Sequence, residues 1–444
     1  MVNRTRKLYS LALALPLALV LASCGGGGGE TPTDKPSSTD EAAPGADGDQ
    51  ELTVWTWDPA FNIFAMQEAE KVYAADHPGF ALDIVETPWD DLQTKLTTLA
   101  QSEAYDELPD IFLMQNNAFQ KNAINYPDLF TDLTDSGIAF DEFPAGVTAY
   151  SNIDGANFGV PFDAGTAVGA YRTDILEEAG LTTDDFTDIT WSKFLELGKQ
   201  VKEKTGKPLL SGQAGSSDLM MMILQSAGAS LFDAEGNATI VDNAALIEAI
   251  ETYTQLVKDG ILVEVNSWDE YIATLVNGEV AGTINGIWIV GSIQTATDQS
   301  GKWNITNLPK LDKTAGATNY SANGGSSWAV SSTANAELAE DFLKSTFAGS
   351  KELYDIILPK AGAVANWIPA GDSAVYGEKQ PFFGDQPIFQ MVVQFGKDVP
   401  QTNTGVYYYE GRDAVSAALT QVIQGSDITA ALTDAQKNVD FAMN

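Results

Sequence analysis

The chain has few of the residues on which metal, redox and acid–base chemistry depend. Cys24 is the only cysteine and His77 the only histidine among its 444 residues. Transition-metal sites draw on clustered His and Cys side chains, and a serine–histidine pair needs a base. His77 stands in a turn signature, DHPG at residues 76–79. The sequence therefore predicts no metal ion, no cofactor and no catalysis of the serine–histidine type.

Positive charge is also scarce. The formal net charge is −37, and Arg172 and Arg412 are the only arginines after residue 23. This balance argues against binding to nucleic acid, and so few arginines argue against a clamp for an anionic ligand. We interpret the excess of carboxylates as dispersed surface charge that keeps the protein in solution.

The N-terminus has the pattern of a bacterial lipoprotein signal. Arg4, Arg6 and Lys7 precede an apolar run at residues 11–21, which is too short for a stable membrane span. The run ends in LASC at residues 21–24, which resembles a lipobox. We expect residues 1–23 to be a signal peptide and Cys24 to carry lipid on the extracytoplasmic face of the cell membrane. The alternative is a free thiol within an uncleaved segment.

The segment after Cys24 is expected to be a tether. Residues 25–29 are five glycines, and Thr, Pro, Ser, Asp and Ala dominate up to residue 50. Such a composition has too little apolar surface to offset the entropy of ordering, so residues 24–50 are predicted to be a flexible linker. The remainder is longer than one hydrophobic core usually organises, and two domains are expected.

The body predicts an α/β fold. Strands are expected at 52–57, 80–84 and 111–114, with a helix after each of the first two. A further strand is expected at 167–171, and later helices lie near 190–206, 246–257, 338–347, 415–423 and 428–439. Alternating strands and helices predict doubly wound, mostly parallel sheets flanked by helices, with binding residues at the carboxyl ends of the strands.

Several segments in order along the chain resemble the family 1 solute-binding proteins of carbohydrate ABC importers, the maltose-binding-protein-like group. The matching segments are 52–57 (LTVWTW), 108–112 (LPDIF), 159–163 (GVPFD), 170–174 (AYRTD), 277–282 (NGEVAG), 286–288 (GIW), 338–342 (LAEDF) and 430–436 (AALTDAQ). Residues 324–328 (GGSSW) and 382–386 (FFGDQ) resemble the lactose/L-arabinose-type branch.

The resemblance implies a two-lobed periplasmic-binding-protein fold of type II. The N-terminal lobe is expected to take residues 51–162 and 324–367, and the C-terminal lobe residues 163–323 and 368–444, with hinge crossings between them. It further implies a monomer that binds a neutral mono-, di- or oligosaccharide containing galactose, arabinose or xylose, and delivers it to the transmembrane subunits of an ABC permease.

Aromatic side chains are the first candidates for a sugar site, because a flat ring can pack against the C–H face of a pyranose. Trp288 stands where the family places its stacking tryptophan, and Trp57 and Asp58 end the first strand. Tyr407 and Tyr408 stand where the family often supplies a second platform. Each aromatic has a core position as its alternative. Trp89 and Trp367 are weaker candidates.

Polar candidates follow the other strand ends and the crossings. The Gln and Asn side chains are expected to pair with hydroxyls, with an Asn-rich turn as the alternative. Asp163 is expected to grip vicinal hydroxyls at a crossing, and the Gly-Gly-Ser run is expected to offer backbone N–H groups or to form a tight turn. These candidates are Gln115, Asn116, Asn117, Asp163, Gly324, Gly325 and Ser326.

Two other functions remain open from the residues. A glycoside hydrolase or lyase needs two carboxyl groups at a fixed separation, and Asp58 and Asp163 are the pair that it would use. A surface adhesin would bind no soluble ligand. The loop at residues 233–237 (DAEGN) has the look of a calcium loop but lacks further ligands, so a hairpin turn is expected there. Residues 220–222 (MMM) are interpreted as core.

Overall fold

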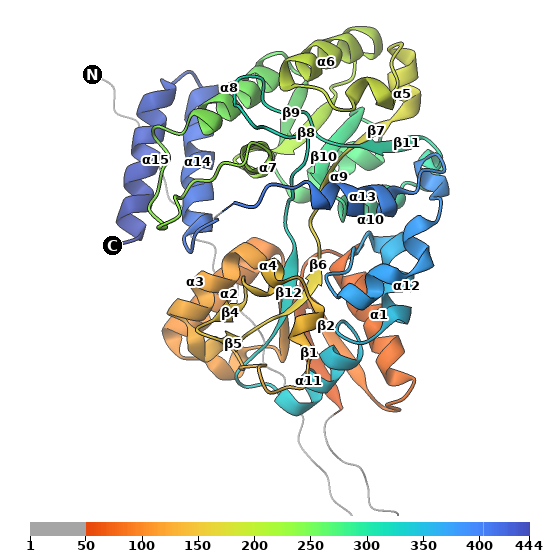
Figure 1. The fold of residues 1–444 in the computed structure, drawn as a ribbon, viewed down its shortest axis with the longest axis vertical. Coiled ribbons are helices and arrows are strands. Elements are labelled where there is room, and N and C mark those ends of the chain that lie inside the picture. The colour runs from red at the N-terminus through yellow and green to blue at the C-terminus, as the bar shows by residue number, and fades with distance from the viewer. Residues whose placement is uncertain (1–49, 403) are drawn as a thin grey trace, which may run out of the picture. The chain divides into compact units, whose positions relative to one another are not determined.

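The first sheet joins strands from three distant parts of the chain. The computed structural model describes residues 50–402 and 404–444; the expected signal peptide, Cys24 and the tether up to residue 49 lie outside them. The strand order is β2-β1-β3-β12-β6, and the sheet lies in the lower lobe of Figure 1. The bounds are β1 (Glu51–Thr56), β2 (Ala81–Glu86), β3 (Ile111–Gln115), β6 (Val160–Asp163) and β12 (Ser326–Val330).

The strand directions place the carboxyl ends of β1, β2, β3 and β6 at the same edge of the sheet as the amino end of β12. β1 pairs in parallel with β2 and β3, whereas β12 runs antiparallel to both β3 and β6. β1 alternates between buried and more exposed residues, and the apolar part of β3 is buried throughout, as a strand covered on both faces requires. The helices around this sheet are α1 (Asn62–Ala74), α2 (Trp89–Ser102), α3 (Asn116–Asn125), α4 (Ala145–Thr148), α11 (Ala336–Ser345) and α12 (Lys351–Ala361), with a small hairpin of β4 (Asn152–Ile153) and β5 (Ala156–Asn157).

The second lobe has mixed strand directions. β7 (Ala167–Arg172) lies between β10 (Gly282–Gly286) and β11 (Trp303–Thr306) and is antiparallel to both, whereas β8 (Leu210–Gln213) and β9 (Leu262–Val265) pair in parallel. The expected α/β class is confirmed, but the parallel arrangement holds only for β1–β2–β3 and β8–β9. Periodicity shows which face of a strand is buried and leaves the direction of its neighbour open.

Helices of the second lobe begin and end where their capping residues stand. The Thr190 hydroxyl accepts from Lys193 N at the start of α6, which ends at Gly206 with φ +73°. The helices are α5 (Thr173–Glu178), α6 (Trp191–Thr205), α7 (Asp218–Ser226), α8 (Ala244–Lys258), α9 (Trp268–Val276), α10 (Ile289–Gln294), α13 (Ile388–Lys397), α14 (Tyr408–Ile423) and α15 (Ile428–Ala442). Short 3-10 turns connect several elements: η1 (Tyr105–Glu107), η2 (Pro127–Leu129), η3 (Phe140–Glu142), η4 (Thr183–Phe186), η5 (Thr297–Gln299), η6 (Ile368–Asp372), η7 (Ala374–Gly377) and η8 (Pro381–Phe383).

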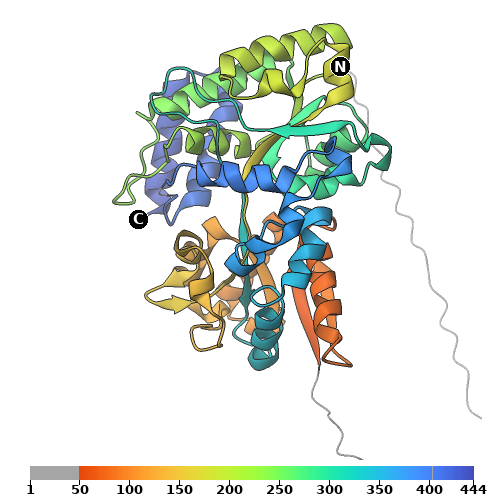
Figure 2. The same ribbon diagram turned by 45° about the vertical axis from the view of Figure 1, so that its right-hand side comes forward.

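Narrow strand-like segments link the two lobes, as Figures 1 and 2 both show. Asp163 bridges to Ala365, and Thr166 bridges to Ala322, so three separate stretches of chain meet there. Gly165 lies within this crossing, where an added Cβ atom would come 2.4 Å from the Asn323 carbonyl oxygen. Only glycine permits such a close approach of two backbones.

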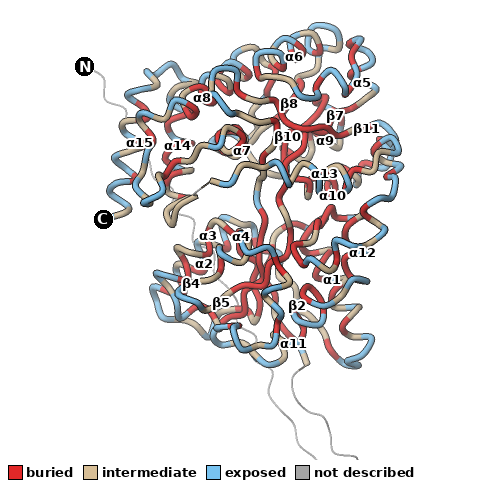
Figure 3. The backbone as a smooth tube through the Cα atoms, viewed as in Figure 1, coloured by how far each residue is buried: buried red, intermediate tan, exposed pale blue. Residues whose placement is uncertain are grey.

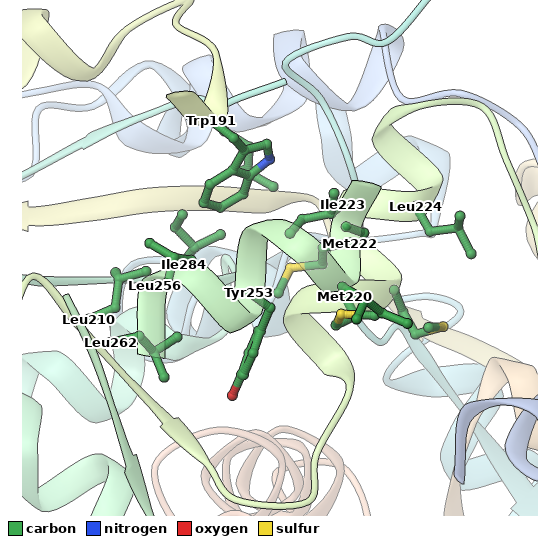
Figure 4. Close-up of a cluster of buried hydrophobic side chains, with 14 of the residues drawn as sticks. Trp191, Leu210, Met220, Met222, Ile223, Leu224, Tyr253, Leu256, Leu262 and Ile284 are labelled. Carbon is green, nitrogen blue, oxygen red and sulfur yellow. The ribbon is translucent and has the colours of Figure 1, made fainter. Parts of the chain in front are cut away.

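Buried residues are concentrated in the interior of each lobe (Figure 3), and one further cluster brings α10 together with Leu358 and Val364 of the N-terminal lobe. One core surrounds the first sheet and includes Val54 and Trp328; another lies in the second lobe among α6, α7, α8 and α14. Figure 4 shows part of the latter, including Met220, Met222 and Tyr253. Met220, Met221 and Met222 are all buried, which confirms their interpretation as core.

Candidate functional site

The carboxyl edge of the first sheet gathers many of the predicted site residues. Because β12 is antiparallel to its neighbours, its first residue, Ser326, pairs with the last residues of β3 and β6, Gln115 and Asp163. Trp57 and Asp58 follow β1 at the same edge. Strand direction alone therefore brings together residues that are up to 269 positions apart in the chain.

The turn after β1 is held rigidly by its own polar groups. The Asn62 carbonyl oxygen Oδ1 accepts from Thr56 Oγ1 at 2.6 Å and from the backbone N–H of Asp58 at 2.9 Å. Asp58 Oδ1 in turn accepts from Ala60 N and Phe61 N. Burial raises the pKa of Asp58, opposed by these two backbone hydrogen bonds. Asn62 Oδ1 also accepts from the Trp57 backbone N–H at 3.1 Å and so fixes the backbone at Trp57.

Asp163 is engaged at the hinge. Its Oδ1 accepts from the Ser326 backbone N–H at 3.0 Å and from the Ser326 hydroxyl, and the side chain is 2% exposed. Its backbone oxygen accepts from Asn366 Nδ2 at 2.6 Å. Burial raises the pKa of the carboxyl group to about 6, against the lowering effect of the Ser326 bonds. In this geometry Oδ1 of Asp163 joins two crossings. The expected grip of Asp163 on vicinal hydroxyls stays a prediction.

The predicted amides have different surroundings. Asn116 is buried, and its Oδ1 accepts from Ser327 Oγ at 2.8 Å, whereas Asn117 is half-buried and forms a side-chain hydrogen bond with Tyr408. Gly325 has φ +88°, and an added Cβ atom would come 3.1 Å from Asn116 Nδ2. The Gly-Gly-Ser run therefore forms a tight turn over Asn116.

Trp288 lies two residues after the end of β10, at the start of α10, and is half-buried. Its Nε1 donates to the Asn323 carbonyl oxygen at 2.9 Å. The ring centroid is 6.3 Å from that of Phe61 in the other lobe and 5.8 Å from that of Trp268. Gly286 makes room for it, since a Cβ atom there would come 2.2 Å from Trp288 Nε1.

A first cavity, the inner cavity, lies along β8, beside Leu262 of β9 and the end of β10, and holds about 540 Å³ of empty space, part of it open to solvent. Its base is core: Leu210, Met222, Tyr253, Leu262 and Ile284 belong both to its lining and to the cluster in Figure 4. The groups that give it polar and aromatic character are Ser211, Gln213, Ser216, Asp218, Trp268, Tyr271 and Asn285.

None of these polar and aromatic residues was among the predicted site residues. Gln213 ends β8 and Asn285 lies in β10, so the rule that had identified Gln115 at a strand end could have found them. Trp268 was hidden because it is the first residue of α9, and only packing against Trp288 shows its relation to the site.

A second cavity, the interlobe cavity, holds about 620 Å³ of empty space, part of it open to solvent. Asn117 and Tyr150 line it from the N-terminal lobe, and Gln225, Thr404 and Tyr408 from the C-terminal lobe, with Asn323 and Gly324 at the crossing. Every described residue that lines this cavity is uncharged. The cavity thus brings together three of the predicted residues, Asn117, Gly324 and Tyr408.

The two cavities are neighbours. α7 contributes Asp218, Leu219 and Met222 to the inner cavity and Met221, Leu224 and Gln225 to the interlobe cavity. Asn323 Nδ2 donates to Asn285 Oδ1 at 2.8 Å, which joins the walls of the two cavities directly. Together they form an uncharged to weakly acidic surface of amides, hydroxyls and aromatic rings.

The remaining aromatic candidates lie in different surroundings. Trp57 packs against Trp89 with ring centroids 5.1 Å apart, and Trp89 against Tyr409 at 5.9 Å. Tyr407 instead packs against the core of the C-terminal lobe. Trp367 is 7% exposed and donates through Nε1 to Glu142, so it is a core residue of the N-terminal lobe.

Within residues 50–402 and 404–444, no cluster of His, Cys, Asp or Glu has the makings of a metal site. The loop at 233–237 is a turn, with Phe232 bridged to Ala238 and Asp233 Oδ1 accepting from Asn237 N at 2.8 Å. Over the same described residues, none of the helices combines the length and apolar character needed to traverse a bilayer.

Comparison with known proteins places this geometry in a family. The profile of the bacterial extracellular solute-binding proteins matches residues 68–359. The lactose-binding protein of Rhizobium radiobacter is 36% identical over 379 residues, covering 85% of this chain and 89% of that protein. An arabinooligosaccharide-binding protein of Bacillus subtilis (strain 168) is 25% identical, covering 71% and 74%.

A solved structure has the same fold. The ABC-transporter-associated binding protein of B. animalis subsp. lactis Bl-04, in complex with β-1,6-galactobiose, superposes with a TM-score of 0.74 at 20% identity, over 89% of this chain and 96% of that one. The expected two-lobed periplasmic-binding-protein fold of type II is therefore confirmed. The chain belongs to the family of bacterial extracellular solute-binding proteins.

Proposed function

We propose that this protein captures a neutral di- or oligosaccharide containing galactose, arabinose or xylose between its lobes and delivers it to the transmembrane subunits of an ABC importer. The relatives named for lactose and for arabinooligosaccharides support this class of ligand, as does the neighbour bound to galactobiose. The protein acts as a monomer, with the lobes at 51–162 plus 324–367 and 163–323 plus 368–444 closing about the crossings near Asp163, near Asn323 and after Trp367.

The observation that carries the proposal is the uncharged, amide-rich interlobe cavity beside half-buried indoles. A pyranose has apolar C–H faces and a rim of hydroxyls, so rings and amides are its natural partners. A buried aromatic ring covers roughly 150–250 Å², so Trp268 and Trp288 can supply much of a micromolar affinity, about 8 kcal/mol. Asn117, Gln225 and Asn323 then discriminate between epimers, because an unpaired buried polar group costs about 1–3 kcal/mol.

Charge supports a neutral guest. Arg172 donates to both carboxylate oxygens of Asp174, at 2.9 and 2.7 Å, and Arg412 lies 3.7 Å from Asp218 and 3.1 Å from Asp413. Both arginines of the described chain are therefore already neutralised by carboxylates. An anionic sugar would have to displace one of these pairs.

We further propose that the sugar is bound without being transformed. A hydrolase would use the carboxyl groups of Asp58 and Asp163. Asp58 accepts a backbone hydrogen bond in the turn after β1, and Asp163 accepts one at the hinge. Incubation with the bound sugar and an assay for new reducing ends tests this. Turnover that is lost in Asp163→Asn would support the hydrolase instead.

The proposed attachment is through lipid on Cys24. The lipobox at residues 21–24 and the extracellular family support it. Labelled fatty acid should be incorporated into the wild-type protein and not into Cys24→Ser. Label retained in the variant would contradict the anchor.

The decisive experiment is calorimetry against a panel of galactose-, arabinose-, xylose- and glucose-containing oligosaccharides, with wild type and Trp288→Ala. We expect a member of the first three groups to bind, and the variant to lose about 2 kcal/mol, or about 30-fold in affinity. Trp55→Ala is the matched control, because Trp55 packs under Lys95 away from both cavities. No binding to any member, or unchanged affinity in Trp288→Ala, would contradict the proposal or its site.

A further inference from the structure

Tyr409 belongs to one lobe by sequence and to the other by packing. It is the second residue of α14, whose later residues lie in the core of the C-terminal lobe. Its own ring is 8% exposed and packs in a hydrophobic cluster of the N-terminal lobe that includes Leu92 and Phe119. The side chain therefore reaches across from one lobe and is buried in the other.

Partners from both lobes hold the ring. From the N-terminal lobe, Trp89 packs against it with centroids 5.9 Å apart, and Gln115 Oε1 accepts from its hydroxyl. From its own helix, the Arg412 guanidinium lies 4.6 Å from the ring centroid. Next to it Lys121 of α3 and Glu410 of α14 form an ion pair between the lobes. Tyr409 is thus held by α2 and β3 of the N-terminal lobe and by α14 of the C-terminal lobe.

The contact around Tyr409 adjoins the proposed sugar site. Tyr408, which precedes Tyr409 in the chain, lines the interlobe cavity, and so does Asn117, two residues after Gln115. Trp89, against which Tyr409 packs, also packs against Trp57 at the carboxyl end of β1. Tyr409 thus covers the Trp89 ring next to the cavity-lining residues Tyr408 and Asn117, on the side where α3 meets α14. A sugar ring that extended in that direction would meet Tyr409 in place of an open aromatic face.

We propose that Tyr409 is a specificity-determining residue that closes the sugar site at its α3–α14 end and so limits the number of sugar units that fit. The inference rests on the proposed function. A longer sugar would have to lift the ring from Trp89, break its bond to Gln115 and leave that glutamine oxygen without its partner. The ion pair contributes less, because Lys121 and Glu410 are 34% and 21% exposed and partly exposed pairs are weak.

Calorimetry with sugars of increasing length tests the inference. Galactose- and arabinose-containing ladders, from two to five units, are titrated into wild type, Tyr409→Ala and Tyr409→Phe. We expect Tyr409→Ala to raise the affinity for the longest sugars relative to the shortest by about tenfold or more, because an aromatic face is uncovered. Tyr409→Phe keeps the ring and should retain the wild-type length profile. Tyr409→Val serves if the alanine variant does not fold.

The outcomes separate the two proposals. If wild type binds a sugar and Tyr409→Ala has the same length profile as wild type, the proposed function stands and the role of Tyr409 is overturned. No binding by wild type to either ladder overturns both. Lys121→Ala is the matched control, because it breaks the ion pair and leaves the ring in place; it should change the affinity for all lengths by the same factor.

A measurement without sugar checks the contact itself. Zero-length carbodiimide coupling joins amines only to carboxylates that touch them, so Lys121 and Glu410 should be linked in the wild-type protein and the product identified by peptide mass. The linked peptide should be lost in Lys121→Ala. If coupling in wild type gives no such peptide, α3 and α14 do not hold the site closed in solution, and the inference fails.

Discussion

At the residue scale, the carboxylates near the proposed site stabilise the backbone. Asp58 accepts from Ala60 N and Phe61 N, and Asp163 from Ser326. Both were predicted at strand ends and crossings, and both lie there. The hydrogen-bond partner of Asp163 could not be predicted, because Ser326 is 163 positions away and meets Asp163 only after the chain has returned through β12.

Asp163→Asn should change how stability depends on pH. Burial raises the pKa of Asp163 from 3.8 to about 6, so between these values the folded protein holds a proton that the unfolded chain has released. Stability from this group is therefore present at low pH and falls as pH rises from about 4 to 6, by about 3 kcal/mol in total. An asparagine still accepts from Ser326 and has no such dependence.

Urea unfolding of wild type and Asp163→Asn at pH 4, 5, 6 and 7 measures the effect. The stability of wild type relative to the variant should fall over this range and level off above about pH 6. Ser373→Ala, at a half-buried position outside the crossings, is the control for general effects of pH. Parallel curves for wild type and Asp163→Asn would show that Asp163 does not titrate in this window.

At the scale of elements, helix caps position the aromatic residues of the site. The Ser267 hydroxyl accepts from Glu270 N at 3.2 Å and so caps α9, whose first residue is Trp268. A serine cap of this kind is worth about 1 kcal/mol. The start of α9 was missed from the sequence, because a short helix after a strand gives little periodicity, and Trp268 was missed with it.

Ser267→Ala should therefore lower both stability, by about 1 kcal/mol, and sugar affinity, by several-fold, because the first turn that carries Trp268 becomes less ordered. The matched control is Ser350→Ala, which removes a similar cap from α12, where Ser350 Oγ accepts from Leu353 N at 3.1 Å. Urea unfolding and calorimetry measure the two quantities. Equal loss of affinity in both variants would show that the cap of α9 has no special relation to the site.

At the scale of the whole body, residues 50–402 and 404–444 form two lobes joined by narrow crossings that meet at Asp163, Gly165 and Asn323. The close approach of Gly165 to Asn323 leaves no room for a side chain, so the crossings are fixed against each other. Each lobe has a core of its own, and a further cluster packs α10 of one lobe against Leu358 and Val364 of the other. Such an arrangement allows hinge closure when a ligand contacts both lobes.

A bound sugar should consequently compact and stabilise the protein together. At a free sugar concentration of 100 times Kd, stability should rise by about 2.7 kcal/mol, and the radius of gyration from small-angle scattering should fall. Trp288→Ala, at the same sugar concentration, should show a smaller change in both. A rise in stability with an unchanged radius would mean that the sugar binds one lobe without closing the hinge.

The amino-acid pattern by itself determined the α/β class, the positions of β1, β3 and α6, and the placement of Trp57, Gln115 and Trp288 at strand ends, because periodicity, caps and strand ends are local properties. Tertiary structure alone decided that β7 has antiparallel neighbours, that Asp163 bonds to Ser326, that Trp268 packs beside Trp288, and that Tyr409 is buried in the opposite lobe. Those features depend on which distant segment returns to lie beside a given face. The chain pattern specifies that a face is buried, and packing selects its partner.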